Sequence, residues 1–169
     1  MANGTKHAVV EIADVKSTHC GHIFNFVDAT NDYDNGCVLA KGAIDPKEYE
    51  IYSVKVPTTS DRVMLIASVP TIPEARTQME KAEHNFYNKA GEVMRAYELN
   101  VYDRYAVSSV LFDKEPEAGN FVVVGEKGTY KVVDSANDEM FVAEVERIVT
   151  KGYGSAADKR IYLSVVKNG

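Results

Sequence analysis

The stretch Tyr49-Glu50-Ile51-Tyr52-Ser53-Val54-Lys55-Val56 alternates polar and apolar side chains and ends at Pro57. An alternation with a period of two residues is typical of a β-strand that buries one face. Proline ends such a strand because it has no backbone N–H to donate to a neighbouring strand. This stretch therefore predicts a strand over residues 49–56, and the same period recurs along most of the chain.

Other runs rich in β-branched and aromatic residues are separated by short turn-forming segments. Asn35-Gly36 is a strong turn signal because both residues tolerate a positive φ, and Gly125-Glu126-Lys127-Gly128 predicts the turn of a hairpin. Many short strands joined by short turns predict a mainly β protein with a barrel-like or sandwich-like architecture. The further predicted strands are His7–Ile12, Ile23–Val27, Cys37–Ala40, Arg62–Val69, Ala96–Leu99, Tyr105–Ser108, Phe121–Val124, Tyr130–Val133, Phe141–Val149 and Ile161–Val166, with a Gly/Ser/Ala loop at 152–157.

One segment breaks the β pattern. Thr71-Ile72-Pro73-Glu74 has the form of a capping box, in which Thr71 is the N-cap and Glu74 the third helical residue. Apolar residues then recur at helical spacing at Ala75, Met79, Ala82 and Phe86. These signals predict one short helix near residues 73–84.

The chain has 169 residues, which is enough for one ordinary core or two small ones. Asp113-Lys114-Glu115-Pro116-Glu117 is the most plausible internal joint. We therefore predict an N-terminal β lobe over residues 1–112, which includes the short helix, and a C-terminal β lobe over residues 113–169. One compact unit is the alternative.

Composition narrows the classes of partner. The net charge is −6 and no segment gathers Lys and Arg, whereas a duplex-binding protein needs a basic surface, so we expect no nucleic-acid partner. No apolar run approaches the roughly 20 residues that span a bilayer, so we expect no membrane partner. The N-terminus lacks the apolar core of a signal peptide, which predicts synthesis in a cytoplasm, where the protein is kept or from which it is released by lysis rather than by secretion. The two cysteines are expected to be thiols.

His19-Cys20-Gly21-His22, with Cys37 further along, is the sharpest metal-like cluster. Zinc needs four nitrogen or sulfur ligands in a tetrahedron, and these residues nominally supply four donors. His19 and Cys20, however, point to opposite faces of a strand, and the spacing matches no finger or ribbon. We therefore predict a pair of loop histidines and two small core thiols, with no bound metal and no cofactor.

Two further segments resemble known binding motifs, but they do not match the spacing or the flanking structure of those motifs. Setting Gly36 at the sixth position of an EF-hand loop puts Gly42 where the bidentate Glu belongs, so residues 28–36 are predicted to form a solvated turn. Gly125–Gly128 resembles the loop of a KH domain, but a strand pattern follows it where that domain has a helix. No nucleotide-binding, esterase or metalloprotease motif is present, so nothing favours an enzyme.

One part of the chain resembles a known family. The segments Asn85-Phe86-Tyr87-Asn88-Lys89-Ala90-Gly91, Arg95-Ala96-Tyr97-Glu98-Leu99 and Asp103-Arg104-Tyr105-Ala106-Val107-Ser108 are similar to a run in small phage head proteins, the capsid decoration or head-fiber-like proteins. The resemblance extends over residues 20–149. Further similar segments, in the same order, are Asp34–Val38, Val63–Pro70, Glu117–Val123 and Phe141–Val145.

The resemblance implies a β-barrel-like, non-enzymatic subunit on the outside of a phage capsid. Its partner would be the major capsid protein, with self-association as a homo-oligomer as a further option. The family's turn has a glycine before Asp103, where this chain has Tyr102. The alternatives are a tail or head–tail connector component, or a free β-domain that binds a small ligand or metal. Residues 1–8 are a candidate docking arm, and the candidate capsid contacts are Lys6, His7, Phe86, Tyr87, Arg95 and Tyr97.

Overall fold

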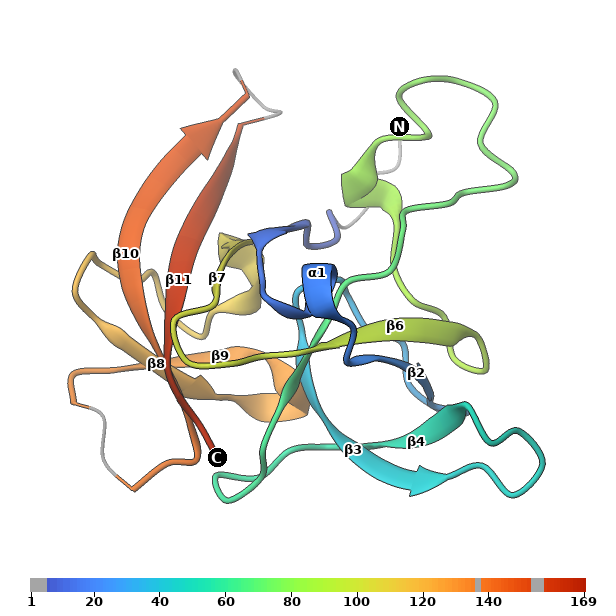
Figure 1. The fold of residues 1–169 in the computed structure, drawn as a ribbon. Coiled ribbons are helices and arrows are strands. Elements are labelled where there is room, and N and C mark those ends of the chain that lie inside the picture. The colour runs from blue at the N-terminus through green and yellow to red at the C-terminus, as the bar shows by residue number, and fades with distance from the viewer. Residues whose placement is uncertain (1–5, 136–137, 153–156) are drawn as a thin grey trace.

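The computed structural model describes residues 6–135, 138–152 and 157–169. It confirms the mainly β fold class: a closed five-stranded barrel lies beside a six-stranded sheet (Figure 1). The barrel strands are β2 (Ile23–Val27), β3 (Val38–Ile44), β4 (Ile51–Lys55), β5 (Met64–Ile66) and β6 (Val93–Glu98). The sheet strands are β1 (Val10–Asp14), β7 (Arg104–Ser108), β8 (Phe121–Val124), β9 (Tyr130–Val133), β10 (Phe141–Lys151) and β11 (Asp158–Asn168).

The barrel closes in the order β2-β4-β3-β5-β6. The pair β2 and β4 is parallel, while the other four pairs are antiparallel. Closure leaves no free strand edge in this half of the molecule. All three residues of β5 are buried, as expected for the short apolar run before Pro70.

The sheet has the order β1-β7-β11-β10-β8-β9, and all its neighbouring strands are antiparallel. The predicted hairpin is present as β8 and β9, joined through a 3-10 helix, η3 (Glu126–Gly128). In the turn between β6 and β7, Tyr102 has a φ of 72°. A side chain at this position therefore accepts the left-handed conformation that glycine adopts most easily.

One continuous core joins the barrel to the sheet. The Tyr130 hydroxyl on β9 donates a hydrogen bond of 2.7 Å to the carbonyl of Gly36, just before β3. Asn168 at the end of β11 bonds both backbone groups of Val63 and the carbonyl of Leu99. The sheet takes β1 and β7 from residues 1–112, so the division between the two sheets does not coincide with the predicted joint at residue 113.

The predicted helix near residues 73–84 is wrong in position. This segment consists of turns that lead into a 3-10 helix, η1 (Glu83–Asn85). The Glu80 carboxylate accepts hydrogen bonds from the backbone N–H groups of Arg76 and Thr77. Met79 is 84% exposed, so the apolar stripe has no surface to pack against. A helix shorter than about 12 residues is marginal without such packing.

The single α-helix of the described residues, α1 (Ser17–Cys20), lies where the sequence indicated strand geometry. Ser17 is fully buried and its hydroxyl donates a hydrogen bond of 2.8 Å to the carbonyl of Glu98. The carboxylate of Asp103 accepts from the backbone N–H of Lys16 at 3.0 Å. These contacts with the β6–β7 connection fix the turn locally. No helix in the described ranges has both the length and the apolar character needed to cross a membrane.

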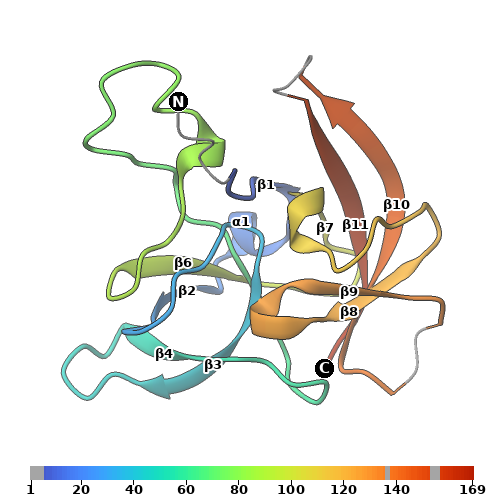
Figure 2. The same cartoon turned by 180° about the vertical axis from the view of Figure 1, so that it is seen from behind.

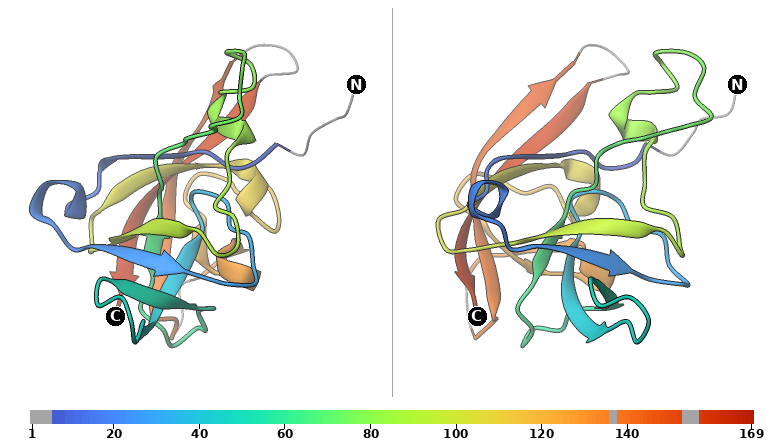
Figure 3. Two further views of the ribbon diagram at one scale, coloured as in Figure 1. Left: turned by 90° about the vertical axis from the view of Figure 1, so that its right-hand side faces the viewer. Right: turned by 45° about the vertical axis from the view of Figure 1, so that its right-hand side comes forward.

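Two segments project from the same end of the molecule, away from the C-terminus (Figures 1 and 2). One is the loop arm, residues 69–82. The other is the hairpin arm, which comprises residues 146–152 of the β10 side and 157–160 of the β11 side. Two further views show the same arrangement (Figure 3).

Candidate partner-binding site

A cleft of about 360 Å³, which we call the arm cleft, lies between the base of the loop arm and the hairpin arm. Its walls come from four parts of the chain that are distant in sequence. The lining residues are Lys6, His7, Val9, Glu83, His84, Ser108, Val110, Lys151, Gly152, Asp158 and Arg160.

The N-terminal segment forms one wall of the arm cleft and is held on the barrel side by His7. The backbone N–H of His7 donates to the carbonyl of His84 at 2.8 Å, and its ring nitrogen lies 2.7 Å from a carboxylate oxygen of Asp34. The ring also stacks on Tyr87, with 4.5 Å between the ring centroids. The other oxygen of Asp34 accepts from the N–H of Ala8 at 3.0 Å. Of the predicted docking arm 1–8, His7 and Ala8 therefore pack against the protein, and residues 1–5 lie outside the described residues.

Ser108 forms the floor of the cleft. Its hydroxyl oxygen accepts hydrogen bonds from the backbone N–H of Val9 at 2.9 Å and from the Arg160 guanidinium at 2.7 Å. The hydroxyl hydrogen is directed to a carboxylate oxygen of Asp158 at 2.8 Å. The side chain is 2% exposed and its bonding capacity is filled. Ser108 thus joins β1, β7 and β11 and is not presented as a nucleophile.

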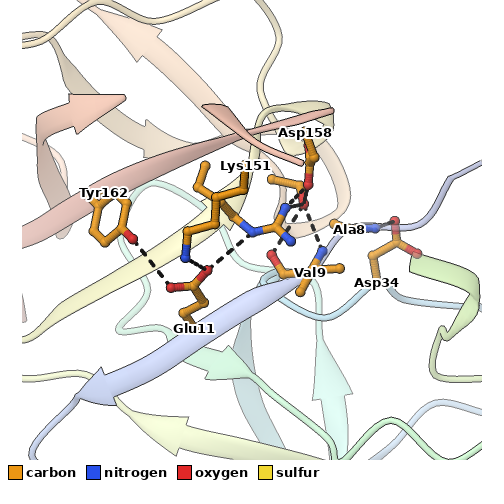
Figure 4. Close-up of polar contacts among 9 residues, drawn as sticks. Ala8, Val9, Glu11, Asp34, Lys151, Asp158 and Tyr162 are labelled. Atoms are coloured by element: carbon orange, nitrogen blue, oxygen red, sulfur yellow. Dashed lines mark hydrogen bonds and ion pairs between the residues drawn. The ribbon is translucent and has the colours of Figure 1, made fainter. Parts of the chain in front are cut away.

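Glu11 on β1 collects donors from both strands of the hairpin arm (Figure 4). Its carboxylate pairs with the Lys151 ammonium, lies 3.5 Å from Nε of Arg160 and accepts from the Tyr162 hydroxyl at 3.4 Å. The hydrogen bond to Glu11 raises the pKa of Lys151 above its ordinary value. Arg160 also pairs with Asp158. Two carboxylates balance two cations, so this network fixes the arm and leaves no net charge.

A second groove, of about 320 Å³, adjoins the arm cleft on the far side of η1. Its walls carry Val69, Ile72, Phe86 and Val93 together with polar residues such as Asn85. Val69 is 69% exposed and Val93 is 53% exposed. These two valines offer exposed apolar contact area beside the groove.

Four of the six candidate capsid contacts line the two hollows, and the other two lie on β6. Lys6 and His7 line the arm cleft, and Phe86 and Tyr87 line the adjoining groove. The stacking of His7 on Tyr87 connects the two hollows. Arg95 and Tyr97 lie apart from them on β6, where Arg95 is exposed and Tyr97 is 7% exposed.

The four metal-like residues are not brought together. His19 and Cys20 lie on α1, so the strand geometry assumed for them is wrong, and Cys20 is exposed and contacts the carbonyl of Lys16, so the prediction that it is a core thiol is also wrong. His22 is exposed and pairs with Glu98. Cys37 is buried, and burial together with the nearby Asp34 raises the pKa of its thiol to about 12. Within residues 6–135, 138–152 and 157–169, no group of three or more His, Cys, Asp and Glu side chains is arranged to hold a metal ion.

The acidic segment 28–36 is a turn organised by one carboxylate. Asp28 accepts hydrogen bonds from Asn31, from the backbone and hydroxyl of Thr30, and from the Tyr33 hydroxyl at 2.9 Å. Burial opposes the charge, but these bonds outweigh it and hold the pKa of Asp28 well below its ordinary value. Donors within the protein therefore occupy the hydrogen-bonding positions of the Asp28 carboxylate.

Sequence reasoning missed Glu11, Ser108, Asp158 and Arg160. They come from three strands, and only the pairing of β1 with β7 and of β7 with β11 makes them neighbours. No family model matches the sequence, and comparison with curated proteins and with solved structures returned no significant match. The resemblance to phage head proteins stays a prediction.

Proposed function

We propose that this chain is a non-enzymatic structural subunit that binds the outside of a phage capsid, with the major capsid protein as its partner. The observation that carries the proposal is the convergence of Lys6, His7, Phe86 and Tyr87 on adjoining hollows at the end from which both arms project. Two of them belong to the segment that resembles the phage proteins.

The chemistry of this end favours contact over catalysis. The arm cleft offers balanced ion pairs and a serine whose hydrogen-bonding capacity is filled, and the adjoining groove offers mixed polar and apolar walls. A partner that covers both would bury apolar side chains together with satisfied polar groups, and protein interfaces commonly combine the two. Many such contacts on one shell add through avidity, so each contact can be weak.

Quantitative peptide mass spectrometry of purified particles tests the proposal. A ratio of this chain to the major capsid protein near one, or near a simple fraction, is expected for a subunit that follows the shell lattice. A few copies per particle would instead favour the tail or head–tail connector alternative. Complete absence from particles would end the virion proposal.

Binding to particles that lack the chain tests the surface itself. Tyr87→Ala removes the ring on which His7 stacks, and Phe86→Ala removes an apolar wall of the groove. Both variants are expected to lower the occupancy of such particles, measured by co-sedimentation. Tyr49→Ala is the matched control, because Tyr49 is 78% exposed on a loop of the barrel outside both hollows. Equal loss of occupancy in all three variants would contradict the assignment of this surface.

A further inference from the structure

The outer edge of β10 is open over half of its length. β10 pairs with β11 from Phe141 to Lys151, but it pairs with β8 only at Ala143 and Glu144. Val145 still exchanges hydrogen bonds with Gly119 and Asn120. From residue 146 to residue 151, no segment of the described chain pairs with this edge.

An open strand edge exposes backbone hydrogen-bond donors and acceptors. In an antiparallel pair, alternate residues direct both their N–H and their C=O away from the partner strand, so about half of these backbone groups point outward. Six residues extend about 20 Å, which is the length of an average strand. The edge has no proline, but a bulge between Val145 and Arg147 and the charged side chains of Arg147 and Lys151 restrict which strands can be added to it. The natural complement of this edge is another extended backbone.

The side chains along this edge favour an incoming strand that carries a negative charge. Arg147, Val149 and Lys151 alternate along one face. Lys151 is paired with Glu11, whereas the guanidinium of Arg147 lies over the Tyr162 ring at 4.2 Å. No carboxylate of the described residues pairs with Arg147. Opposite charges that face each other across two strands are stabilising, so an incoming strand with an acidic residue at this register is favoured.

We propose that residues 146–151 bind an extended segment of a different polypeptide as an added strand, with an acidic residue opposite Arg147. A second copy of this chain fits less well. Antiparallel pairing of two such edges within residues 147–151 offers Arg147 only Val149, Lys151 or another Arg147, and none of these is acidic. The inference rests on the edge alone and does not depend on the virion role.

An NMR titration of the full chain tests the inference. The probe is the hexapeptide TVEVTV, acetylated and amidated, and the comparison peptide carries lysine in place of its glutamate. Amide shifts confined to residues 146–151 are expected, with about fivefold tighter binding of the glutamate peptide, because a cross-strand charge pair contributes up to about 1 kcal/mol. Arg147→Glu is expected to reverse this preference. Arg76→Glu, an equal change of charge on the loop arm, is expected to leave it unchanged.

A third peptide separates strand addition from simple electrostatic attraction. N-methylation of alternate residues keeps the glutamate but removes the backbone donors, so binding at least tenfold weaker is expected. Equal binding of the N-methylated peptide, or shifts spread over other surfaces, would overturn the inference. Failure of Arg147→Glu to reverse the preference would overturn the assigned register.

Discussion

The junction between barrel and sheet and the attachment of the hairpin arm use opposite chemistry. The junction is buried and neutral, and its hydrogen bonds come from Tyr130 and Asn168. Besides the backbone pairing of Arg160 with Ser108, the arm is attached through Glu11, whose pair with Lys151 is exposed to water and salt, whereas the Arg160 guanidinium is only 11% exposed. Burial makes an unpaired polar group costly, whereas an exposed ion pair contributes little. The junction is therefore expected to determine stability, and the ion pairs to determine the position of the arm.

The largest effect is expected where the two sheets approach most closely. Gly128 has a φ of 80°, and an added Cβ would lie 2.4 Å from the carbonyl oxygen of Val38. Gly128→Ala should lower the free energy of unfolding by more than about 3 kcal/mol, measured by urea denaturation. Gly91→Ala is the matched control, because Gly91 has the same φ of 80° with nothing near its added Cβ. Its expected loss is only about 1 kcal/mol, and equal losses would show that backbone strain alone acts at Gly128.

Truncation of Asn168 is expected to cause the second largest loss in the free energy of unfolding. Its truncation to alanine leaves the N–H and carbonyl of Val63 and the carbonyl of Leu99 without their side-chain partner in a buried site. The expected loss is about 2 to 3 kcal/mol, by thermal or urea unfolding. The neighbouring Lys167→Ala provides a control, with an expected change below about 0.5 kcal/mol. A small effect at Asn168 would mean that the chain end does not tie the barrel to the sheet.

Tyr130→Phe removes two buried hydrogen bonds, the one to the carbonyl of Gly36 and the one shared with the Tyr105 hydroxyl, with an expected loss of about 1 to 2 kcal/mol. The same hydroxyl makes stability depend on pH. Burial raises the pKa of Tyr130 and of Tyr105, so the folded state holds both protons more tightly than the unfolded state does. The contribution of these two hydroxyls is fully present below the unfolded tyrosine pKa of about 10 and is lost as the pH rises above it, while the buried Cys37 thiol adds a fall that begins near its ordinary pKa of about 9. If Tyr130→Phe unfolds with the wild-type pH profile above pH 10, this linkage is refuted.

The smallest effect on stability is expected at the hairpin arm. Glu11→Gln removes the carboxylate that Lys151 and Arg160 share, yet exposed ion pairs contribute less than about 1 kcal/mol, and salt screens them. The change should appear instead as faster amide hydrogen exchange in residues 146–151 at low salt, with little difference at high salt. Glu144→Gln, an exposed carboxylate on the same strand with no ion pair among the described contacts, is the control. Salt-independent exchange in Glu11→Gln would show that the ion pairs do not hold the arm.

Predictions from the sequence succeeded where local patterns decided the structure and failed where contacts with distant parts of the chain decided it. Strand β4 was predictable from its alternation, and the β8–β9 hairpin was predictable from two β-rich runs on either side of the turn residues 125–128. The helix near residues 73–84 had correct local signals but no core to receive Met79. The strand geometry assumed at His19 and Cys20 failed because Ser17 and Lys16 form hydrogen bonds with distant parts of the chain.

The candidate site was predictable only in part. Lys6, His7, Phe86 and Tyr87 were selected from the sequence, and the structure places them around two adjoining hollows. Glu11, Ser108 and Arg160 carry no sequence signal, because a charged or hydroxyl residue in a strand usually faces solvent. Their role depends on two strand pairings that span long stretches of chain.

Local sequence patterns specify that the chain forms many short strands, and in a strand such as β4 they also indicate which face is buried, because both properties depend on neighbours along the chain. The pairing of β2 with β4, the pairing of β1 with the distant β7 and the extension of β10 past β8 follow only from the folded arrangement. Backbone hydrogen bonds are alike in every strand. Their partners are therefore chosen by the packing of the whole core, and that choice also sets which edge stays open.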